Sequence, residues 1–231
     1  MGEYIVMMKY IIAFAIAPLS AIAQSEIIAI DVLIEPDQAM MEKAEEWNSR
    51  LRAELPQGFE LDAAHAPHIT LLQTFVLRDD MDAILAAVAK VGGQFDIDAL
   101  TMEATGLYHV PAGEIGLQGI VIEPSQDLHA IQDEVIEAIE PFRKPAVGEE
   151  AFVPDPSGAP FDPQLFTYVD SFVAEQSGEK FNPHVTTGVG PIDWVEARET
   201  EPFEGFTFGA EGIAVYQLGN YGTAAERLSG K

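Results

Sequence analysis

The sequence predicts an α+β fold, built from short strands and helices that alternate along the chain. Hydrophobic residues make up 48% of its 231 residues and charged residues 22%, which is ordinary for a folded globular protein. The strand candidates are short and lack the long parallel-sheet runs of a doubly wound fold. A four-residue motif also occurs twice, once in each half of the chain. This length and pattern fit one compact unit or two small lobes that share a cleft.

The first elements expected after residue 26 are a buried strand and an amphipathic helix. Residues 27–34 are almost all apolar, as in a strand covered on both faces, and Pro36 closes the run. Asp37 is placed to cap a helix that ends at Pro56 and Gly58. The apolar residues at helical spacing, which we expect in the core, are Met40, Met41, Ala44, Trp47, Leu51 and Leu55.

Strands and two helices are expected between residues 66 and 141. Branched and aromatic residues favour the first strand, and Gly92 and Gly93 end the helix that follows it. A Pro-Ala-Gly turn at 111–113 joins two further strand candidates into a hairpin. The expected elements are strands over 66–76, 95–107 and 115–122, a helix from Asp79 or Asp80 to Val91, and a helix from Ser125 to Pro141.

The second half of the chain is expected to contain a long loop and then regular elements. Residues 145–163 are rich in Pro, Gly and acidic residues, which is typical of a surface loop. A helix over 164–176 follows, and then a strand over 182–189 opened by a proline. Residues 206–218 are expected to form a closing pair of strands with Gly212 at the turn.

The N-terminus is typical of a secretory signal peptide. Residues 8–24 contain one basic residue, an apolar run and an Ala21-x-Ala23 ending, which predicts cleavage after Ala23. The run is short for a membrane span, so we expect no span in the mature protein. We therefore expect residues 1–23 to be a signal peptide, residues 24–231 to form one domain, and the protein to be periplasmic or secreted. The alternative is a cytoplasmic protein in which this run is a buried strand or helix.

The chain is strongly acidic and has no cysteine. Its 38 Asp and Glu residues and 12 Lys and Arg residues give a formal net charge of −26, and residues 1–23 hold one of each sign. Proteins that grip long nucleic acid carry a basic stripe, which this sequence lacks, so we expect a small phosphate-containing substrate. The charge can also serve solubility alone. Without cysteine there is no disulfide, no thiolate nucleophile and no Cys-based zinc site.

The motif that indicates chemistry is Pro67-His68-Ile69-Thr70, repeated 116 positions later as Pro183-His184-Val185-Thr186. Each copy lies on an expected strand, where residues i and i+2 point to the same face. Each therefore presents an imidazole and a hydroxyl side by side. Two such strands facing across a cleft would offer two imidazoles and two hydroxyls to one ligand.

These four side chains suit the opening or closing of a cyclic phosphodiester. One neutral histidine can take a proton from the attacking oxygen while the other, protonated, gives one to the leaving oxygen. Because the ordinary pKa of histidine is about 6.5, both forms are accessible near neutrality. The threonine hydroxyls can donate to the non-bridging phosphate oxygens. The motif does not indicate which histidine is the base.

The two motifs resemble the paired histidine motifs of the 2H phosphoesterase superfamily, which includes 2′-5′ RNA ligase-like proteins and cyclic phosphodiesterases. Residues 181–186 and 215–224 are also similar to stretches of bacterial members, and the resemblance covers most of the chain after about residue 27. It implies a two-lobed α+β fold in which two antiparallel sheets flank a central cleft. Helices lie outside these sheets, and the halves form a pseudo-twofold internal repeat.

The resemblance also implies roles for four residues. His68 and His184 are expected to be the catalytic acid and base, and Thr70 and Thr186 are expected to bind the substrate phosphate. No metal or other cofactor is expected. The predicted signal peptide and the acidity depart from the family pattern and argue against a role on tRNA or other large RNA.

The other histidines are expected to lie outside the site. His65 and His68 form a His-x-x-His pair, which can indicate a metal, but Pro67 lies between them and no helix is expected there. His109 precedes a proline and is expected at a turn. His129 falls beside the apolar stripe of a helix, where we expect it at the solvent boundary.

Three functions can use this set of residues. The first is a metal-independent phosphoesterase that hydrolyses 2′,3′-cyclic phosphates of nucleotides or short oligonucleotides. The second is an exported module that binds a phosphorylated small molecule without turnover, and the third is a 2′-5′ RNA ligase. Arg78 and Lys180 are the bases nearest the motifs in sequence, and either can line the rim of the site, although surface charges are the favoured interpretation. The sequence leaves the oligomeric state open.

Overall fold

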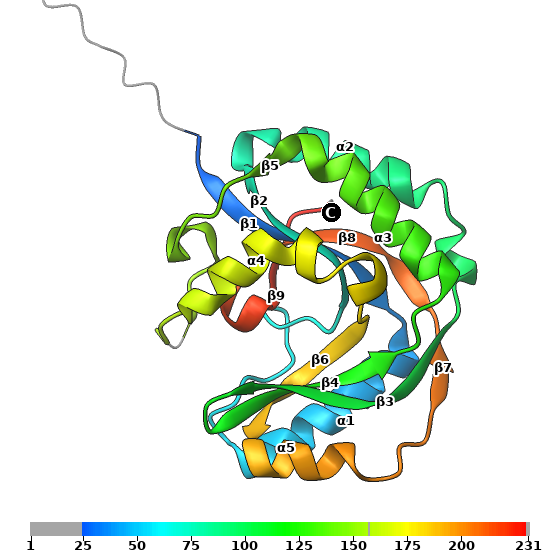
Figure 1. Cartoon of the computed structure of the whole chain (residues 1–231), viewed down its shortest axis with the longest axis vertical. Helices are drawn as coiled ribbons and strands as arrows, with labels where there is room; N and C mark the ends of the chain where they lie inside the picture. Colours follow the sequence, from blue (N-terminus) through cyan, green and yellow to red (C-terminus); the bar gives the residue numbers. More distant parts are fainter. Residues whose placement is uncertain (1–24, 157, 230–231) are drawn as a thin grey trace, which may run out of the picture.

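The computed structural model describes residues 25–156 and 158–229, and within them the chain has the predicted α+β architecture (Figure 1). The signal peptide predicted for residues 1–23 lies outside the described residues. None of the helices in the described part combines the length and apolar character that crossing a bilayer requires.

The strands form one curled antiparallel sheet. Its strands are β1 (Ile27–Pro36), β2 (Ile69–Leu77), β3 (Met102–Ala112), β4 (Ile115–Ile122), β5 (Arg143–Lys144), β6 (His184–Pro191), β7 (Phe206–Phe208), β8 (Ala210–Leu218) and β9 (Ala224–Arg227). Their order is β7-β3-β4-β6-β2-β1-β8-β9, with β5 paired to β2. The two predicted sheets are the halves of this sheet, which meet at β2 and β6 through the single pair Ile69 and Val185 (Figure 1).

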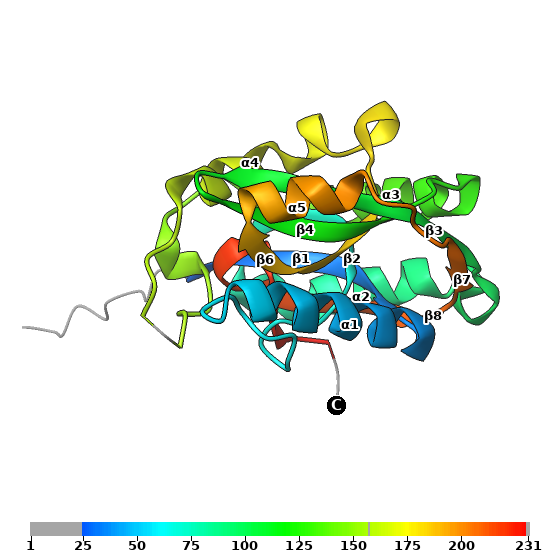
Figure 2. The same cartoon turned by 90° about the horizontal axis from the view of Figure 1, so that it is seen from below.

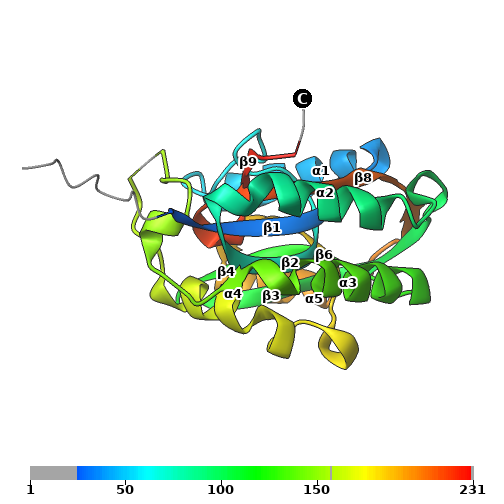
Figure 3. The ribbon, with the colours of Figure 1, turned by 90° about the horizontal axis from the view of Figure 1, so that it is seen from above.

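Four helices of the described chain cover the outer faces of the two half-sheets, whereas α4 (Pro163–Glu175) packs on the face that carries Ala29 and Phe75. The others are α1 (Gln38–Glu54), α2 (Met81–Gly92), α3 (Gln126–Ile139) and α5 (Ile192–Glu199). The α2 and α3 helices pack on the half that contains β2, β1 and β8 (Figure 3). The α1 and α5 helices pack on the half that contains β6, β4 and β3 (Figure 2). The α4 helix lies against β2.

The helix starts follow from the predicted capping residues. The Asp37 carboxylate accepts hydrogen bonds from the backbone N–H groups of Ala39 and Met40, and the Ser125 hydroxyl accepts one from Leu128. Such caps contribute about 1 kcal/mol each because they satisfy otherwise unpaired N–H groups. The helix expected from Asp79 or Asp80 begins at Met81 instead, after one 3-10 turn.

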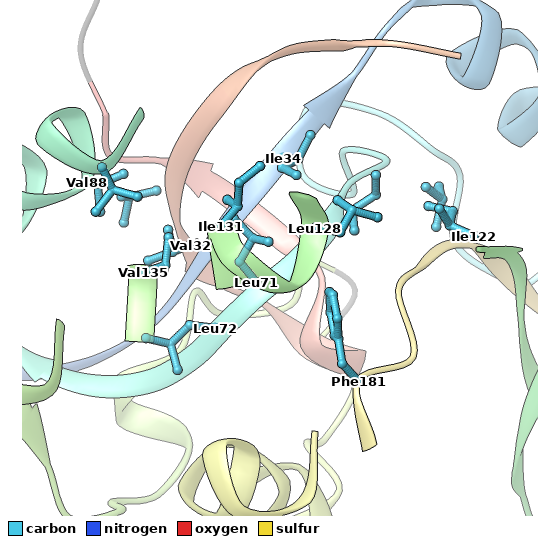
Figure 4. Packing of buried hydrophobic residues seen from close by; sticks show 14 of the residues in the cluster. Val32, Ile34, Leu71, Leu72, Val88, Ile122, Leu128, Ile131, Val135 and Phe181 are labelled. Atoms are coloured by element: carbon cyan, nitrogen blue, oxygen red, sulfur yellow. The ribbon is translucent and has the colours of Figure 1, made fainter. Parts of the chain in front are cut away.

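The β1 strand is buried on both faces, as its apolar run predicted. One face carries Ile28, Ile30, Val32 and Ile34, which join the main core. Figure 4 shows Val32 and Ile34 in this core together with Val88 of α2 and Ile131 of α3. Full burial of each such side chain stabilises the fold by about 1.5–3 kcal/mol. The opposite face carries Ala29, Asp31 and Leu33, and it is this face that meets the two motifs.

The closing strand pair predicted for residues 206–218 is wrong. The β7 strand pairs with β3 in one half-sheet, whereas β8 pairs with β1 in the other, and Gly212 lies inside β8 opposite Glu35. The chain crosses between the halves at Gly209, whose N–H donates to Asp37 Oδ2 at 2.7 Å. The pairing of β7 and β8 with strands of different half-sheets therefore overrides the turn that Gly212 predicts from local sequence.

Other boundaries differ from the prediction in smaller ways. The first hairpin strand begins at Met102 and not at residue 95, because residues 97–99 form a 3-10 turn. Its second strand, the capped helix at Ser125 and the proline-rich loop before α4 are confirmed. The α5 helix and the β9 strand were not predicted.

Candidate active site

The two repeated motifs lie where the half-sheets join. His184 is the first residue of β6, and His68 immediately precedes β2. Ile69 and Val185 pair with each other and are fully buried. Because side chains alternate along a strand, the histidines and threonines on either side of this pair point away from that core. The two motif strands were expected to face each other across a cleft, whereas they are neighbours in one sheet, joined through this pair.

A small cavity, which we call the junction pocket, opens beside this pair. Its volume is about 10 Å³, which is room for about one water. Its lining residues are Thr70, Tyr168, Phe172, Gln176, Phe181, Asn182 and His184. The structure thus brings one residue of each motif to the same pocket.

Both histidines are anchored in the same way. His68 Nδ1 bonds to the backbone carbonyl of Ala66 at 2.7 Å, and His184 Nδ1 bonds to that of Asn182 at 2.8 Å. In each case the acceptor is the residue before the motif proline, which has no N–H to extend a strand ladder. The two motifs therefore share a local structure as well as a sequence. Because Nδ1 of each ring is bonded to the backbone, Nε2 is the atom that can meet other partners.

The partner of His68 Nε2 is Asp31 on β1, at 3.3 Å from its Oδ2 atom. The same oxygen accepts hydrogen bonds from the Thr70 hydroxyl at 2.8 Å and from Gln73 Nε2 at 2.9 Å. Asp31 is fully buried. A buried carboxylate is costly unless charge and donors surround it, and these three side chains supply both.

This arrangement favours the protonated form of His68. Burial by itself lowers the pKa of His68, but the hydrogen bond and negative charge of Asp31, with the Ala66 carbonyl, raise it above its ordinary value. The contact with Asp31 therefore stabilises a positive charge on His68.

His184 is biased in the opposite direction. Burial lowers the pKa of His184 to about 4, the Asn182 carbonyl opposes this shift, and the charge of nearby His68 adds to it. Its ring contacts the ring of Tyr108 edge-on, with centroids 4.7 Å apart. His184 is therefore neutral near pH 7, whereas the surroundings of His68 favour its protonated form.

Two tyrosines complete the surroundings of the pair. Burial and the negative charge of Asp31 raise the pKa of Tyr168, on α4, to about 12. Burial likewise raises the pKa of Tyr108, on β3. Both hydroxyls therefore stay protonated, and each can donate one hydrogen bond. Tyr168 is also 37% exposed, so it forms part of the outer wall of the junction pocket.

The two threonines have different surroundings. Thr70 lines the junction pocket, but its hydroxyl proton is directed at Asp31. Thr186 is half-buried on β6 and is not among the described residues that line the pocket. The two threonines therefore occupy similar places near the start of their strands, as predicted, but their surroundings differ.

The sequence was compared with known families and structures. A sequence profile described as the 2′-5′ RNA ligase superfamily matches residues 36–218, which is most of the chain. The chain belongs to the 2′-5′ RNA ligase superfamily. The family resemblance drawn from the paired motifs is thereby confirmed. No curated protein matches the sequence.

Among solved structures, this superfamily member is similar to TT0787 of Thermus thermophilus, with 16% identity and a TM-score of 0.49 over 87% of this chain and 96% of that one. It is also similar to LigT of E. coli in apo form, with 11% identity and a TM-score of 0.40 over 89% and 96% of the respective chains.

Three residues that lie beside the two motifs were not identified from the sequence. Asp31 had a visible signal, because it is a lone carboxylate within the apolar run 27–34. Tyr108 and Tyr168 had none, because only the folded chain brings β3 and α4 to the junction.

His65 lies outside the junction pocket. Its Nδ1 atom is 3.0 Å from Asp62 Oδ1, and its ring stacks on Phe59. Among the described residues, no group of three or more His, Cys, Asp or Glu side chains could hold a metal ion. The pair His65 and His68 therefore does not converge on such a site.

The other two histidines are structural. His109 lies within β3, not at a turn as predicted, because the strand continues beyond it and Glu199 of α5 binds its Nδ1 at 2.6 Å. His129 is half-buried and packs edge-on against Phe181, consistent with the predicted boundary position.

The two bases near the motifs are held in surface ion pairs. Arg78 Nε lies 2.6 Å from Glu26, and Lys180 Nζ lies 2.6 Å from Glu175. Neither residue lines the junction pocket. The interpretation of both as surface charges therefore fits the structure better than a place at the rim.

Proposed function

We propose that the protein hydrolyses 2′,3′-cyclic phosphates of nucleotides or short oligonucleotides without a metal, with His184 as general base and His68 as general acid. The observation that carries this proposal is that the two motif histidines meet at one junction, where a buried carboxylate contacts His68 and a backbone carbonyl contacts His184. General acid–base catalysis needs one neutral and one protonated group at the same pH.

In this reaction neutral His184 removes a proton from water as its oxygen attacks phosphorus. The bond from phosphorus to one ring oxygen breaks, and protonated His68 donates its Nε2 proton to that oxygen instead of to Asp31 Oδ2. The products are a phosphomonoester and a free ribose hydroxyl. Proton exchange with solvent then returns His184 to the neutral form and His68 to the charged form.

The hydroxyl groups are proposed to stabilise the charge on the non-bridging phosphate oxygens. Thr70 and Thr186 are the assigned phosphate ligands, and Tyr168 is a further donor beside Thr70. For Thr70 to donate to phosphate, its hydroxyl proton must turn away from Asp31. Asp31 then still accepts the hydrogen bond from Gln73 Nε2. Because the junction pocket holds about one water, Tyr168 must also move for a phosphate to enter.

The charge supports a small substrate. With a net charge of −26, the chain would repel a long polyanion, whereas a mononucleotide or short end carries few charges. We also propose that the protein acts in the periplasm or outside the cell, on the basis of the Ala21-x-Ala23 ending. N-terminal sequencing of the protein from its host tests this, since an intact start would place it in the cytoplasm.

One assay separates the candidates. Purified full-length protein is incubated in EDTA with 2′,3′-cyclic mononucleotides, and phosphomonoester formation is followed by phosphorus NMR. A parallel reaction contains RNA ends with a 2′,3′-cyclic phosphate and a 5′-hydroxyl, which are the substrates of the 2′-5′ RNA ligase reaction that the superfamily name specifies. Joined ends without hydrolysis would favour the ligase, and tight binding without either product would favour the binding module.

A further inference from the structure

A second and larger cavity, which we call the aromatic pocket, lies between four segments that are distant in sequence, one of which is the loop that contains Asp155 and Pro156. Its volume is about 280 Å³. Its walls include the loop between α1 and β2, the turn before β9 and the β6 strand, which lie together in Figure 1. The lining residues used below are Phe59, Asp62, His65, Val189 and Tyr221.

Flat rings dominate one side of the aromatic pocket. Phe59 and His65 stack with centroids 4.9 Å apart and planes 8° apart. The ring of Tyr221 lies 5.9 Å from that of Phe59 and is tilted by 35°. Tyr221 is 41% exposed, which is unusual for a large aromatic residue in the described part of the chain. The exposed ring of Tyr221 at this cavity offers a stacking surface for a flat heteroaromatic ligand.

The backbone holds Tyr221 in a conformation that a tyrosine rarely adopts. Its φ angle is +57°, in the left-handed region that disfavours side chains with a Cβ atom. Asn220 Oδ1 accepts a hydrogen bond from the Tyr221 N–H at 3.0 Å, and Thr223 donates to the Asn220 carbonyl at 2.9 Å. Strain of this kind concentrates at functional sites, where surrounding bonds enforce it.

A carboxylate in the same pocket, that of Asp62, can accept hydrogen bonds from a ligand. Asp62 Oδ1 accepts from the Ala64 N–H at 2.8 Å and contacts His65 Nδ1, and the Asp62 side chain is 55% exposed. Both contacts use one oxygen, so the other can accept from a ligand. A carboxylate pairs with the amino and ring N–H groups of guanine, or with the amino group of cytosine, whereas uracil offers one ring N–H.

The aromatic pocket is joined to the junction by strands and hydrogen bonds. The Gly222 carbonyl, next to Tyr221, accepts from Gln73 Nε2 at 3.2 Å, and Gln73 also donates to Asp31. Val189 follows Thr186 by three residues on β6, which is a separation of about 10 Å at the usual rise of a strand. A sugar and base attached to a phosphate at the junction can span such a distance.

We propose that the aromatic pocket is a nucleobase subsite, which stacks the base of the substrate on Tyr221, itself packed near Phe59, and selects a base with a donor edge, guanine first, through Asp62. The volume of 280 Å³ lies just below the about 300–1,000 Å³ of sites for whole drug-sized ligands, which suits a single base. This inference rests on the proposed function for the placement of the phosphate at His68 and His184.

The test compares guanosine and uridine 2′,3′-cyclic phosphates with bis(p-nitrophenyl) phosphate, a substrate without a base. Tyr221→Asn removes the ring but tolerates the positive φ angle, and Tyr221→Phe keeps the ring. We expect Tyr221→Asn to lower kcat/KM for the guanosine substrate about tenfold or more, mainly through KM. Tyr221→Phe should behave like the wild type, and the baseless substrate should be unaffected by either change.

The carboxylate is tested by Asp62→Asn, with Asp133→Asn on the exposed face of α3 as the matched control. We expect Asp62→Asn to remove the preference for guanosine over uridine, and Asp133→Asn to retain it. Unchanged base preference in Tyr221→Asn and Asp62→Asn, both folded by circular dichroism, would overturn the subsite.

Equilibrium binding of guanosine 3′-monophosphate separates this result from a failure of the proposed function. If the wild type hydrolyses no cyclic phosphate but Tyr221→Asn still weakens binding about tenfold, the subsite stands and the proposed reaction fails. If hydrolysis is intact and neither binding nor preference responds to the substitutions, the reaction stands and the subsite is overturned.

Discussion

Asp31 Oδ2 lies 3.3 Å from His68 Nε2, and this contact joins a fully buried carboxylate of β1 to the first repeated motif. The same oxygen holds the hydroxyl of Thr70 and the amide of Gln73. As a result, the charged form of His68 is favoured, whereas His184, which has no hydrogen bond to a carboxylate in the described structure, is kept neutral by burial. The difference between the two histidines therefore originates mainly outside the motifs.

Replacing Asp31 should leave less of His68 protonated near neutral pH. In Asp31→Asn the hydrogen bond to a negative charge is lost, so the pKa of His68 should fall, which NMR titration of the ring measures. Turnover of cyclic phosphates should fall by no more than the about 10²–10⁴-fold expected for complete loss of a general acid. Asp133→Asn serves as the control. An unchanged His68 pKa in a folded Asp31→Asn variant would show that Asp31 does not set it.

The pH dependence of kcat/KM should be bell-shaped. His184 must be neutral, so activity should rise as pH increases through its pKa of about 4. His68 must be protonated, so activity should fall as pH increases through its pKa, which lies above the ordinary 6.5. The apparent values belong to the coupled pair. A profile with a single limb between pH 3 and 10 would contradict the division of roles.

Removing either motif histidine should reduce turnover strongly. His68→Ala and His184→Ala should each cost about 10²–10⁴-fold, and the double variant should lose far less than the product, because the two act as one unit. His129→Ala, which changes a half-buried histidine on α3, is the control and should retain activity. Normal folding with near wild-type turnover in both motif variants would leave the binding module as the better proposal.

The two threonine variants should differ in kind. Thr70→Val and Thr186→Val should each lower turnover on the order of 10²-fold, by analogy with loss of an oxyanion donor. Thr70→Val also removes a donor from Asp31, so it should shift the high-pH limb of the activity profile. Thr186→Val should leave that limb in place. Equal pH profiles for the two variants would mean that the bond between Thr70 and Asp31 does not influence His68.

Activity should not depend on a divalent metal. The proposed proton transfers use His68 and His184 alone, so dialysis against EDTA should leave kcat unchanged. Turnover lost in EDTA and restored by zinc would contradict this and would bring His65 and Asp62 into the mechanism.

The sequence identified the parts of the site that local pattern encodes. Each His-x-Thr motif lies at the start of a strand behind a proline, and the Asp37 and Ser125 caps begin their helices as expected. These features depend on residues within a few positions of one another. Local spacing therefore sufficed to predict them.

The remaining parts depend on contacts between distant segments. Asp31 meets Thr70 because of the register of β1 against β2, which includes a bulge, and no spacing along the chain encodes that register. Tyr168 reaches the junction only because α4 folds back over β2. The prediction of a closing hairpin was wrong for the same reason, since the partners of β7 and β8 lie in different half-sheets.

The place of β1 in the sheet has a consequence for the symmetry of the molecule. About the junction of β2 and β6, the strand that mirrors β1 is β4, and β4 (Ile115–Ile122) contains no acidic residue. The two motifs alone would give an arrangement in which donor and acceptor are interchangeable. One carboxylate on one side breaks that equivalence, so the two halves of a repeated scaffold favour different protonation states of their histidines, through a strand that carries neither motif.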